Sequence, residues 1–236
     1  MTEARKAELR DNYLRVLERI EKAKQKRGGG EVKLLAATKT VDPEDVIYLI
    51  ENFGLDLCGE NRAQEFTAKY DAVTSAGARM DFIGHLQTNK VKYVAGRAGL
   101  IHSLDSERLA AEIQRVCEKR GAVQDVLIEV NIGMEESKSG VFAGEVGGFL
   151  ERLGGFDRIR ICGMMTMAPK CGSEAEFRKY FRESYTIFVD NFGKKLHNMR
   201  EHVLLSMGMS DSFECAIEEG SDLVRVGSAI FGSRKY

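Results

Sequence analysis

The stretch Val32-Lys33-Leu34-Leu35-Ala36-Ala37-Thr38-Lys39-Thr40 is largely apolar, and Asp42-Pro43-Glu44-Asp45 follows it closely. The apolar run is typical of a buried strand, and an aspartate followed by proline is typical of the first turn of a helix. The stretch therefore predicts a buried strand that ends in Lys39 and leads into a helix. A lysine held against an apolar sheet or barrel loses its proton more easily and can attack a carbonyl. The alternative is a lysine that closes the strand and extends into water.

The same alternation of strand and helix continues along the chain. Helical spacing of apolar residues predicts a first helix over residues 2–27, ended by Gly28-Gly29-Gly30. The strand-like runs are 32–39, 55–58, 80–83, 99–102, 123–131, 158–163, 202–206 and 222–226. The helix-like segments between them are 43–53, 60–76, 86–95, 105–120, 142–152, 173–198 and 210–219, and a short helix is expected after Gly227. The segment 142–152 is the least typical of these helices, because glycines disfavour a helix.

Several of the strand-like runs are short and apolar on both faces, as in Val126-Leu127-Ile128-Glu129-Val130 and Leu223-Val224-Arg225-Val226. Such runs suit a parallel sheet covered by helices. Eight strands joined by helices predict an α/β fold, a single (β/α)8 barrel of the TIM type with an extra N-terminal helix. A doubly wound open sheet is the alternative. Because no linker, repeat or low-complexity stretch is found, we expect one domain over residues 1–236.

Composition and charge argue against several classes of function. The net charge is −1, so no overall field attracts nucleic acid or an anionic membrane. The five cysteines are widely spaced and form no Cys-x-x-Cys, which predicts free, mostly buried thiols in a reducing compartment. The four histidines form no metal-binding pattern. A charged N-terminus with no apolar segment after it predicts no signal peptide, and no stretch is long enough to span a membrane, so we expect a cytoplasmic protein.

Two segments rich in glycine and serine close the last two predicted strands. They are Ser206-Met207-Gly208-Met209-Ser210-Asp211 and Arg225-Val226-Gly227-Ser228-Ala229-Ile230-Phe231-Gly232. In barrels of this type the loops after the seventh and eighth strands often bind phosphate, because glycines let backbone N–H groups approach an anion. Ser210 and Ser228 add hydroxyl donors. Each serine alone is equally well explained as a helix N-cap, but the two segments together predict a phosphate site.

Other polar motifs fall at the same predicted end of the barrel. Asn61, in Gly59-Glu60-Asn61-Arg62, either points into the barrel or caps the next helix. His85 is either a ligand contact or a structural histidine. Met164-Met165-Thr166-Met167 predicts core packing or an apolar wall beside a flat ring. Residues 133–140 lack the glycine that precedes the lysine of a phosphate-binding loop, so we interpret them as a mobile loop at the end of the barrel.

A nucleophilic lysine and a phosphate site at one end of a barrel predict a ligand that carries both a carbonyl and a phosphate. Pyridoxal 5′-phosphate (PLP) meets both requirements, as a Schiff base with Lys39. A phosphorylated sugar handled by an aldolase meets them as well. The residues alone leave both ligands open.

The chain resembles the pyridoxal phosphate homeostasis proteins, also called the YggS or PROSC family, along most of its length. The matching segments are Ala37-Thr38-Lys39-Thr40, Gly59-Glu60-Asn61-Arg62, Phe82-Ile83-Gly84-His85-Leu86-Gln87-Thr88-Asn89-Lys90, Ser137-Lys138-Ser139-Gly140, Met165-Thr166-Met167-Ala168-Pro169, Leu205-Ser206-Met207-Gly208-Met209-Ser210-Asp211 and Val224-Arg225-Val226-Gly227-Ser228-Ala229-Ile230-Phe231-Gly232. Because they occur in the same order, the resemblance is specific. The glycine-rich residues 143–148 match least well.

The resemblance implies a barrel like the N-terminal domain of alanine racemase, with PLP attached to Lys39. The residues that it implies at the cofactor are Lys39, Asn61, Met209, Ser210, Arg225, Gly227 and Ser228. Of these, Ser210, Gly227 and Ser228 would contact the phosphate. Arg225 would lie near the ring nitrogen.

The family is thought to carry or buffer PLP, so the resemblance implies a PLP-binding protein of intracellular PLP homeostasis without robust turnover. No residue is assigned to catalysis. Racemases similar to this barrel rely on a second domain and a second base, and a chain that ends at Tyr236 is not expected to supply them. An arginine at the ring nitrogen would also keep that nitrogen unprotonated and weaken the electron sink. The alternative is a PLP-dependent amino-acid racemase. The expected partners are PLP and PLP-dependent apo-enzymes, for a monomer that binds neither nucleic acid nor membrane.

Overall fold

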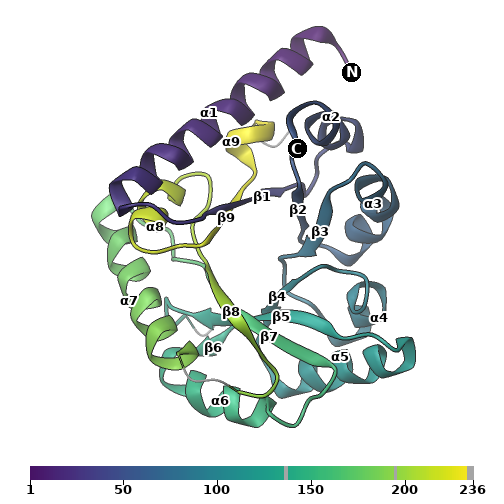
Figure 1. Cartoon of the computed structure of the whole chain (residues 1–236), viewed down its shortest axis with the longest axis vertical. Helices are drawn as coiled ribbons and strands as arrows, with labels where there is room; N and C mark the ends of the chain where they lie inside the picture. Colours follow the sequence, from purple (N-terminus) through teal and green to yellow (C-terminus); the bar gives the residue numbers. More distant parts are fainter. Residues whose placement is uncertain (136–137, 194–195, 233–236) are drawn as a thin grey trace.

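Eight parallel strands close into a barrel, as expected from the sequence (Figure 1). The computed structural model describes residues 1–135, 138–193 and 196–232. The barrel strands are β1 (Lys33–Ala37), β2 (Leu57–Glu60), β3 (Arg79–Phe82), β4 (Ile101–Leu104), β5 (Gln124–Asn131), β7 (Ile159–Thr166), β8 (Met199–Ser206) and β9 (Leu223–Val226). Each pairs with its neighbour in this order, and β1 pairs with β9 to close the ring. The two-residue strand β6 (Val141–Phe142) pairs with β5.

Helices surround the barrel on the outside (Figure 1). They are α1 (Glu3–Arg27), α2 (Pro43–Phe53), α3 (Ala63–Ser75), α4 (Val91–Val94), α5 (Glu107–Arg120), α6 (Val146–Leu153), α7 (Glu174–Phe192), α8 (Phe213–Glu218) and α9 (Ser228–Phe231), with short 3-10 turns at Thr88–Lys90 and Ala143–Glu145. The expected N-terminal helix is α1, which packs against α2, α8 and α9. In the part of the chain that is described, no helix is long and apolar enough to cross a membrane.

Several predicted boundaries are wrong. Only Thr88–Lys90 and Val91–Val94 form turns of helix within 86–95. The helix predicted at 142–152 starts at Val146, behind a short strand and a 3-10 turn. The helix predicted at 173–198 ends at Phe192. Strand β8 is longer than predicted, because it begins at Met199 instead of residue 202.

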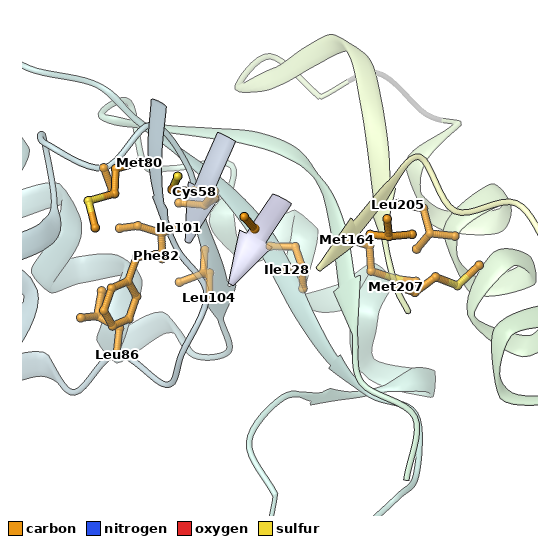
Figure 2. Close-up of a cluster of buried hydrophobic side chains, with 14 of the residues drawn as sticks. Cys58, Met80, Phe82, Leu86, Ile101, Leu104, Ile128, Met164, Leu205 and Met207 are labelled. Atoms are coloured by element: carbon orange, nitrogen blue, oxygen red, sulfur yellow. The ribbon is translucent and has the colours of Figure 1, made fainter. Parts of the chain in front are cut away.

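The main core lies between the barrel and its helices. Figure 2 shows part of it, where outward-facing side chains of neighbouring strands gather: Cys58, Met80, Phe82, Ile101, Leu104, Ile128, Met164 and Leu205, joined by Leu86 and Met207. Because strand side chains alternate between the two faces, the intervening residues point into the barrel. There they form smaller buried clusters, one of which contains Leu35, Ala37, Leu57, Ile83 and Leu223. Of the five free cysteines, Cys171 alone is not fully buried.

Gly163 allows β7 and β8 to stay paired where their register shifts. Its φ is +129°, in the region that side chains other than glycine rarely adopt, and an added Cβ would lie 1.9 Å from the Leu204 carbonyl oxygen. Such a contact requires the backbone to move. This position therefore admits only glycine without distortion of the sheet.

Replacement of this glycine tests its role in the barrel. We expect Gly163→Ala to lower the free energy of unfolding in urea by about 3 kcal/mol, because the added methyl group collides with backbone. Gly155→Ala is the matched control, since a Cβ there meets nothing within 4 Å. Equal stability of the two variants would contradict the assigned role.

Candidate functional site

A cavity of about 810 Å³ opens at the carboxyl ends of the barrel strands. All seven residues expected at a cofactor line it: Lys39, Asn61, Met209, Ser210, Arg225, Gly227 and Ser228. They come from the loops after β1 and β2, from the segment between β8 and α8, and from β9 with the start of α9. The structure brings them together, and their part in binding stays a prediction. Arg5 of α1 also lines the cavity, although nothing in its sequence context indicated this.

Lys39 lies two residues beyond the end of β1 and is partly buried. The residue before it, Thr38, is fully buried, and its N–H donates to the Gly59 carbonyl oxygen at 2.9 Å. The residue after it, Thr40, has a left-handed backbone with φ of +60°. A residue other than glycine rarely adopts this backbone conformation unless its surroundings impose it. The loop that carries Lys39 is thus held in a defined, unusual path.

The surroundings that impose this path come from β2 and α3. Glu60, Glu65 and Lys69 bond to the two residues that flank Lys39. These contacts were not predictable from the sequence, because a lysine and a glutamate four residues apart on a helix are typical of a solvent-exposed face. In the sequence, Glu60 was noted only as part of the motif Gly59-Glu60-Asn61-Arg62, with no role of its own.

The two predicted phosphate loops are joined by a serine. Ser210 Oγ accepts hydrogen bonds from the N–H groups of Gly227 at 3.2 Å and Ala229 at 3.3 Å. Ser210 therefore does not cap its own helix, because Ser212 is the N-cap residue of α8. Gly208 makes the tight path possible: its φ is +94°, and an added Cβ would lie 2.6 Å from that of Ala216. The result is a cluster of hydroxyl and N–H groups on one wall of the cavity.

Arg225 points from β9 into the barrel and forms the floor of the cavity. Only 5% of it is exposed. Its Nη1 donates to the carbonyl oxygen and Oγ of Ser206 at 3.0 and 2.6 Å, and its Nη2 donates to the Thr166 carbonyl oxygen at 2.9 Å. Burial lowers the pKa of Arg225 to about 10, while the charge of Glu129 opposes this change. The guanidinium is therefore fixed in place and still charged at neutral pH.

Glu129 of β5 is a buried acidic residue whose charge acts on Arg225. It is 5% exposed, and one carboxyl oxygen has no hydrogen-bond partner among the described residues. Burial raises the pKa of Glu129 to about 7, with a further contribution from Asp105, and Arg225 opposes the rise. The charge that Glu129 exerts on Arg225 therefore changes near neutral pH.

Asn61 lines the cavity and does not cap α3. The N-cap position of α3 belongs to Arg62, which makes no side-chain capping bond. The side-chain carbonyl oxygen of Asn61 is buried and lacks a partner among the described residues. An unsatisfied buried acceptor is unfavourable, so a ligand that donates a hydrogen bond there would be stabilised.

The remaining predicted motifs have mixed outcomes. Met167 lines the cavity, whereas Met164 and Met165 are buried in the core. His85 lies outside the cavity, more than half exposed, with Nδ1 3.0 Å from Ser139 Oγ. Ser137, within the matching segment before Gly140, lies outside the described residues.

Comparison with known proteins identifies the family. Residues 9–235 match the family model of the alanine racemase N-terminal domain. The pyridoxal phosphate homeostasis protein of Aquifex aeolicus is 47% identical over 224 residues, which cover 94% of this chain and 96% of the relative. An unknown protein from Bifidobacterium adolescentis has a similar structure, with a TM-score of 0.89, 36% identity, and coverage of 98% of this chain and 97% of that one. The structure of PipY from Synechococcus elongatus with PLP bound gives a TM-score of 0.73 at 27% identity, over 85% of this chain and 92% of PipY.

The identity to the curated relative extends over nearly the whole of both chains, and the shared barrel agrees with it. On this basis the chain belongs to the alanine racemase N-terminal domain family and, within it, to the pyridoxal phosphate homeostasis proteins.

Proposed function

We propose that this protein binds PLP as a Schiff base on Lys39 and acts in PLP homeostasis without robust turnover. The observation that carries the proposal is that one cavity contains both Lys39 and the joined loops of Ser210, Gly227 and Ser228. PLP is recorded in the PipY structure, and the Aquifex aeolicus relative bears the name of a PLP homeostasis protein. We further propose a single-domain, cytoplasmic monomer whose partners are PLP-dependent apo-enzymes.

The cavity fits PLP in size and in chemistry. At about 810 Å³ it is within the range of small-molecule sites. Ser210, Ser228 and the Gly227 backbone would bind the phosphate, and the unsatisfied acceptor of Asn61 would take a hydrogen bond from the ligand. Met209, partly exposed at the cavity wall, would cover one side of the ring.

Bound PLP supplies an aldehyde, and a ring that can delocalise negative charge. Lys39 Nζ, once deprotonated, is the nucleophile for the aldehyde carbon. Attachment would replace the carbon–oxygen double bond of the aldehyde by a carbon–nitrogen double bond to Lys39, and the aldehyde oxygen would leave as water with both protons of the amine. This exchange needs no oxidant or reductant, and it is reversible, as a carrier requires.

Arg225 accounts for the absence of robust turnover in the proposal. Its guanidinium, held by Ser206 and Thr166, would lie at the ring nitrogen and remain charged at neutral pH. A positive charge there disfavours protonation of that nitrogen, so the ring withdraws electrons less strongly. Because the family model is that of a racemase domain, racemisation is the second candidate, and a Lys39-dependent racemase activity of the purified protein would favour it.

Chemical trapping tests the attachment point. Purified protein incubated with PLP and reduced with borohydride should carry the pyridoxyl phosphate group on Lys39, located by peptide mass spectrometry. Lys39→Ala should lose the adduct, because it removes the nucleophilic amine. Lys92→Ala, at an exposed position, is the matched control and should keep it. A wild-type protein without an adduct on Lys39 would contradict the proposed function.

The phosphate loops are tested with two ligands. Ser210→Ala removes a hydroxyl group and the link to Gly227 and Ala229. We expect the Kd for PLP to rise about tenfold, the effect of a lost hydrogen bond to a charged group. Pyridoxal, the same ring without the phosphate, is the control ligand and should lose much less affinity. An equal loss for both ligands would argue against a phosphate contact at Ser210.

The raised pKa of buried Glu129 predicts a pH dependence of stability. Glu129 holds its proton more tightly in the folded state, with a pKa of about 7, than in the unfolded chain, where it is near 4.5. The stability from its protonated form is therefore complete below about pH 4.5 and is lost as the pH rises through about 7. We expect the free energy of unfolding of Glu129→Gln, measured in urea, to rise by about 2 kcal/mol relative to that of wild type when the pH is raised from 5 to 8. The same difference at both pH values would contradict the elevated pKa.

A further inference from the structure

The backbone on both sides of Lys39 is fixed by side chains from the next βα unit. Lys69 Nζ donates to the Thr38 carbonyl oxygen at 2.7 Å. Thr38 Oγ1 donates to Glu60 Oε1 at 2.7 Å. On the other side, the Thr40 N–H donates to Glu65 Oε2 at 2.7 Å. The hydrogen bonds thus begin one residue before Lys39 and end one residue after it.

These groups form an unusual interior. The side chain of Lys69 is 8% exposed and that of Glu60 is 0% exposed, and their ion pair measures 2.8 Å. Burial raises the pKa of Glu60, while Lys69 and Thr38 oppose the rise. The second carboxyl oxygen of Glu60 has no hydrogen-bond partner among the described residues. A buried ion pair of this kind is often no more stable than an apolar replacement, so stability alone does not explain it.

The position of the ion pair suggests a different benefit. Glu65 and Lys69 are one helical turn apart on α3, 3.9 Å from each other, and both face the Lys39 loop. Glu65 holds the N–H of Thr40, the residue with a left-handed backbone. A change of φ at Thr40 would redirect the loop, and with it the side chain of Lys39. The bonds therefore act on the orientation of Lys39.

We propose that Thr38, Glu60, Glu65 and Lys69 form a positioning network that directs Lys39 Nζ toward the aldehyde carbon of PLP. This inference rests on the proposed function. The network residues act through Lys39, and the proposed phosphate contacts come from other elements. Loss of the network slows covalent attachment and leaves non-covalent binding of PLP unchanged.

The test separates attachment from binding. Glu65→Ala removes the acceptor for the Thr40 N–H, and Glu65→Gln restores a neutral acceptor. Glu60→Gln/Lys69→Met removes both charges of the buried pair at once. At saturating PLP, the rate at which Lys39 becomes reducible by borohydride should fall about tenfold in Glu65→Ala and in the double variant, because small misplacements of a reacting group have effects of this size or larger. Glu65→Gln should recover most of the wild-type rate.

The same substitutions in the Lys39→Ala background provide the decisive comparison. There, the Kd for PLP should stay within about twofold of the parent, since additivity holds when a substitution touches no ligand contact. Asp81→Asn is the control for loss of a buried carboxylate: Asp81 is fully buried, and its side-chain bonds go to Arg79 and His102, which are not part of the network. It should lower thermal stability and leave the attachment rate unchanged.

Each outcome has a defined meaning. Wild-type attachment rates in Glu65→Ala and the double variant would overturn the positioning role. A rise of about tenfold in the Kd for PLP in the Lys39→Ala background would overturn the positioning role too, because the network would then act on the cavity as a whole. If the double variant does not fold, Glu65→Ala decides, since Glu65 is partly exposed. A wild-type protein that forms no adduct on Lys39 refutes the proposed function, a result distinct from all of these.

Discussion

The parallel pairing of the first barrel strand with the last is the contact on which the site depends. Lys33 to Ala36 of β1 align with Leu223 to Val226 of β9. This register sets the loop of Lys39 beside the loop of Gly227, although the two lie near opposite ends of the sequence. The closeness is visible in Gly227, where an added Cβ would lie 3.1 Å from the Ala37 carbonyl oxygen. The Lys39 amine and a group of hydroxyl and N–H groups therefore line the same cavity because the barrel closes.

The polar groups around this cavity are held in advance of any ligand. Ser210 ties the two loops together, Arg225 makes three hydrogen bonds inside the barrel, and Thr38 is bonded through its N–H, carbonyl and hydroxyl groups. Such rigidity lowers the entropy that binding would otherwise lose. It also carries a stability cost, seen in the buried charges of Arg225, Glu129, Glu60 and Lys69. A protein that must bind one small cofactor specifically has a reason to tolerate this cost.

The fold was predictable because its signal repeats: eight short apolar runs alternate with helical segments, and a closed parallel sheet is what buries both of their faces. Lys39, Asn61, Ser210, Gly227 and Ser228 were predictable because strand ends of such a barrel meet at one end, whereas Met209 and Arg225 were implied only by the family resemblance. Helix lengths were harder to predict from the sequence. Residues 86–95 carry a helical pattern, yet tertiary packing shortens them to turns, whereas α6 forms despite two glycines because Val146, Phe149, Leu150 and Leu153 are buried. The contacts of Glu65 and Lys69 were beyond prediction, since only the folded chain turns that face of α3 toward Lys39.

A crystal structure of the protein grown with PLP would show whether Lys39 carries the cofactor and where the phosphate lies. We expect continuous electron density from Lys39 Nζ to the aldehyde carbon of PLP. The phosphate should lie between Ser210 and the Gly227–Ser228 loop, and Arg225 should face the ring nitrogen. Density for PLP on another lysine, or in this cavity with the phosphate directed away from those loops, would contradict this expectation.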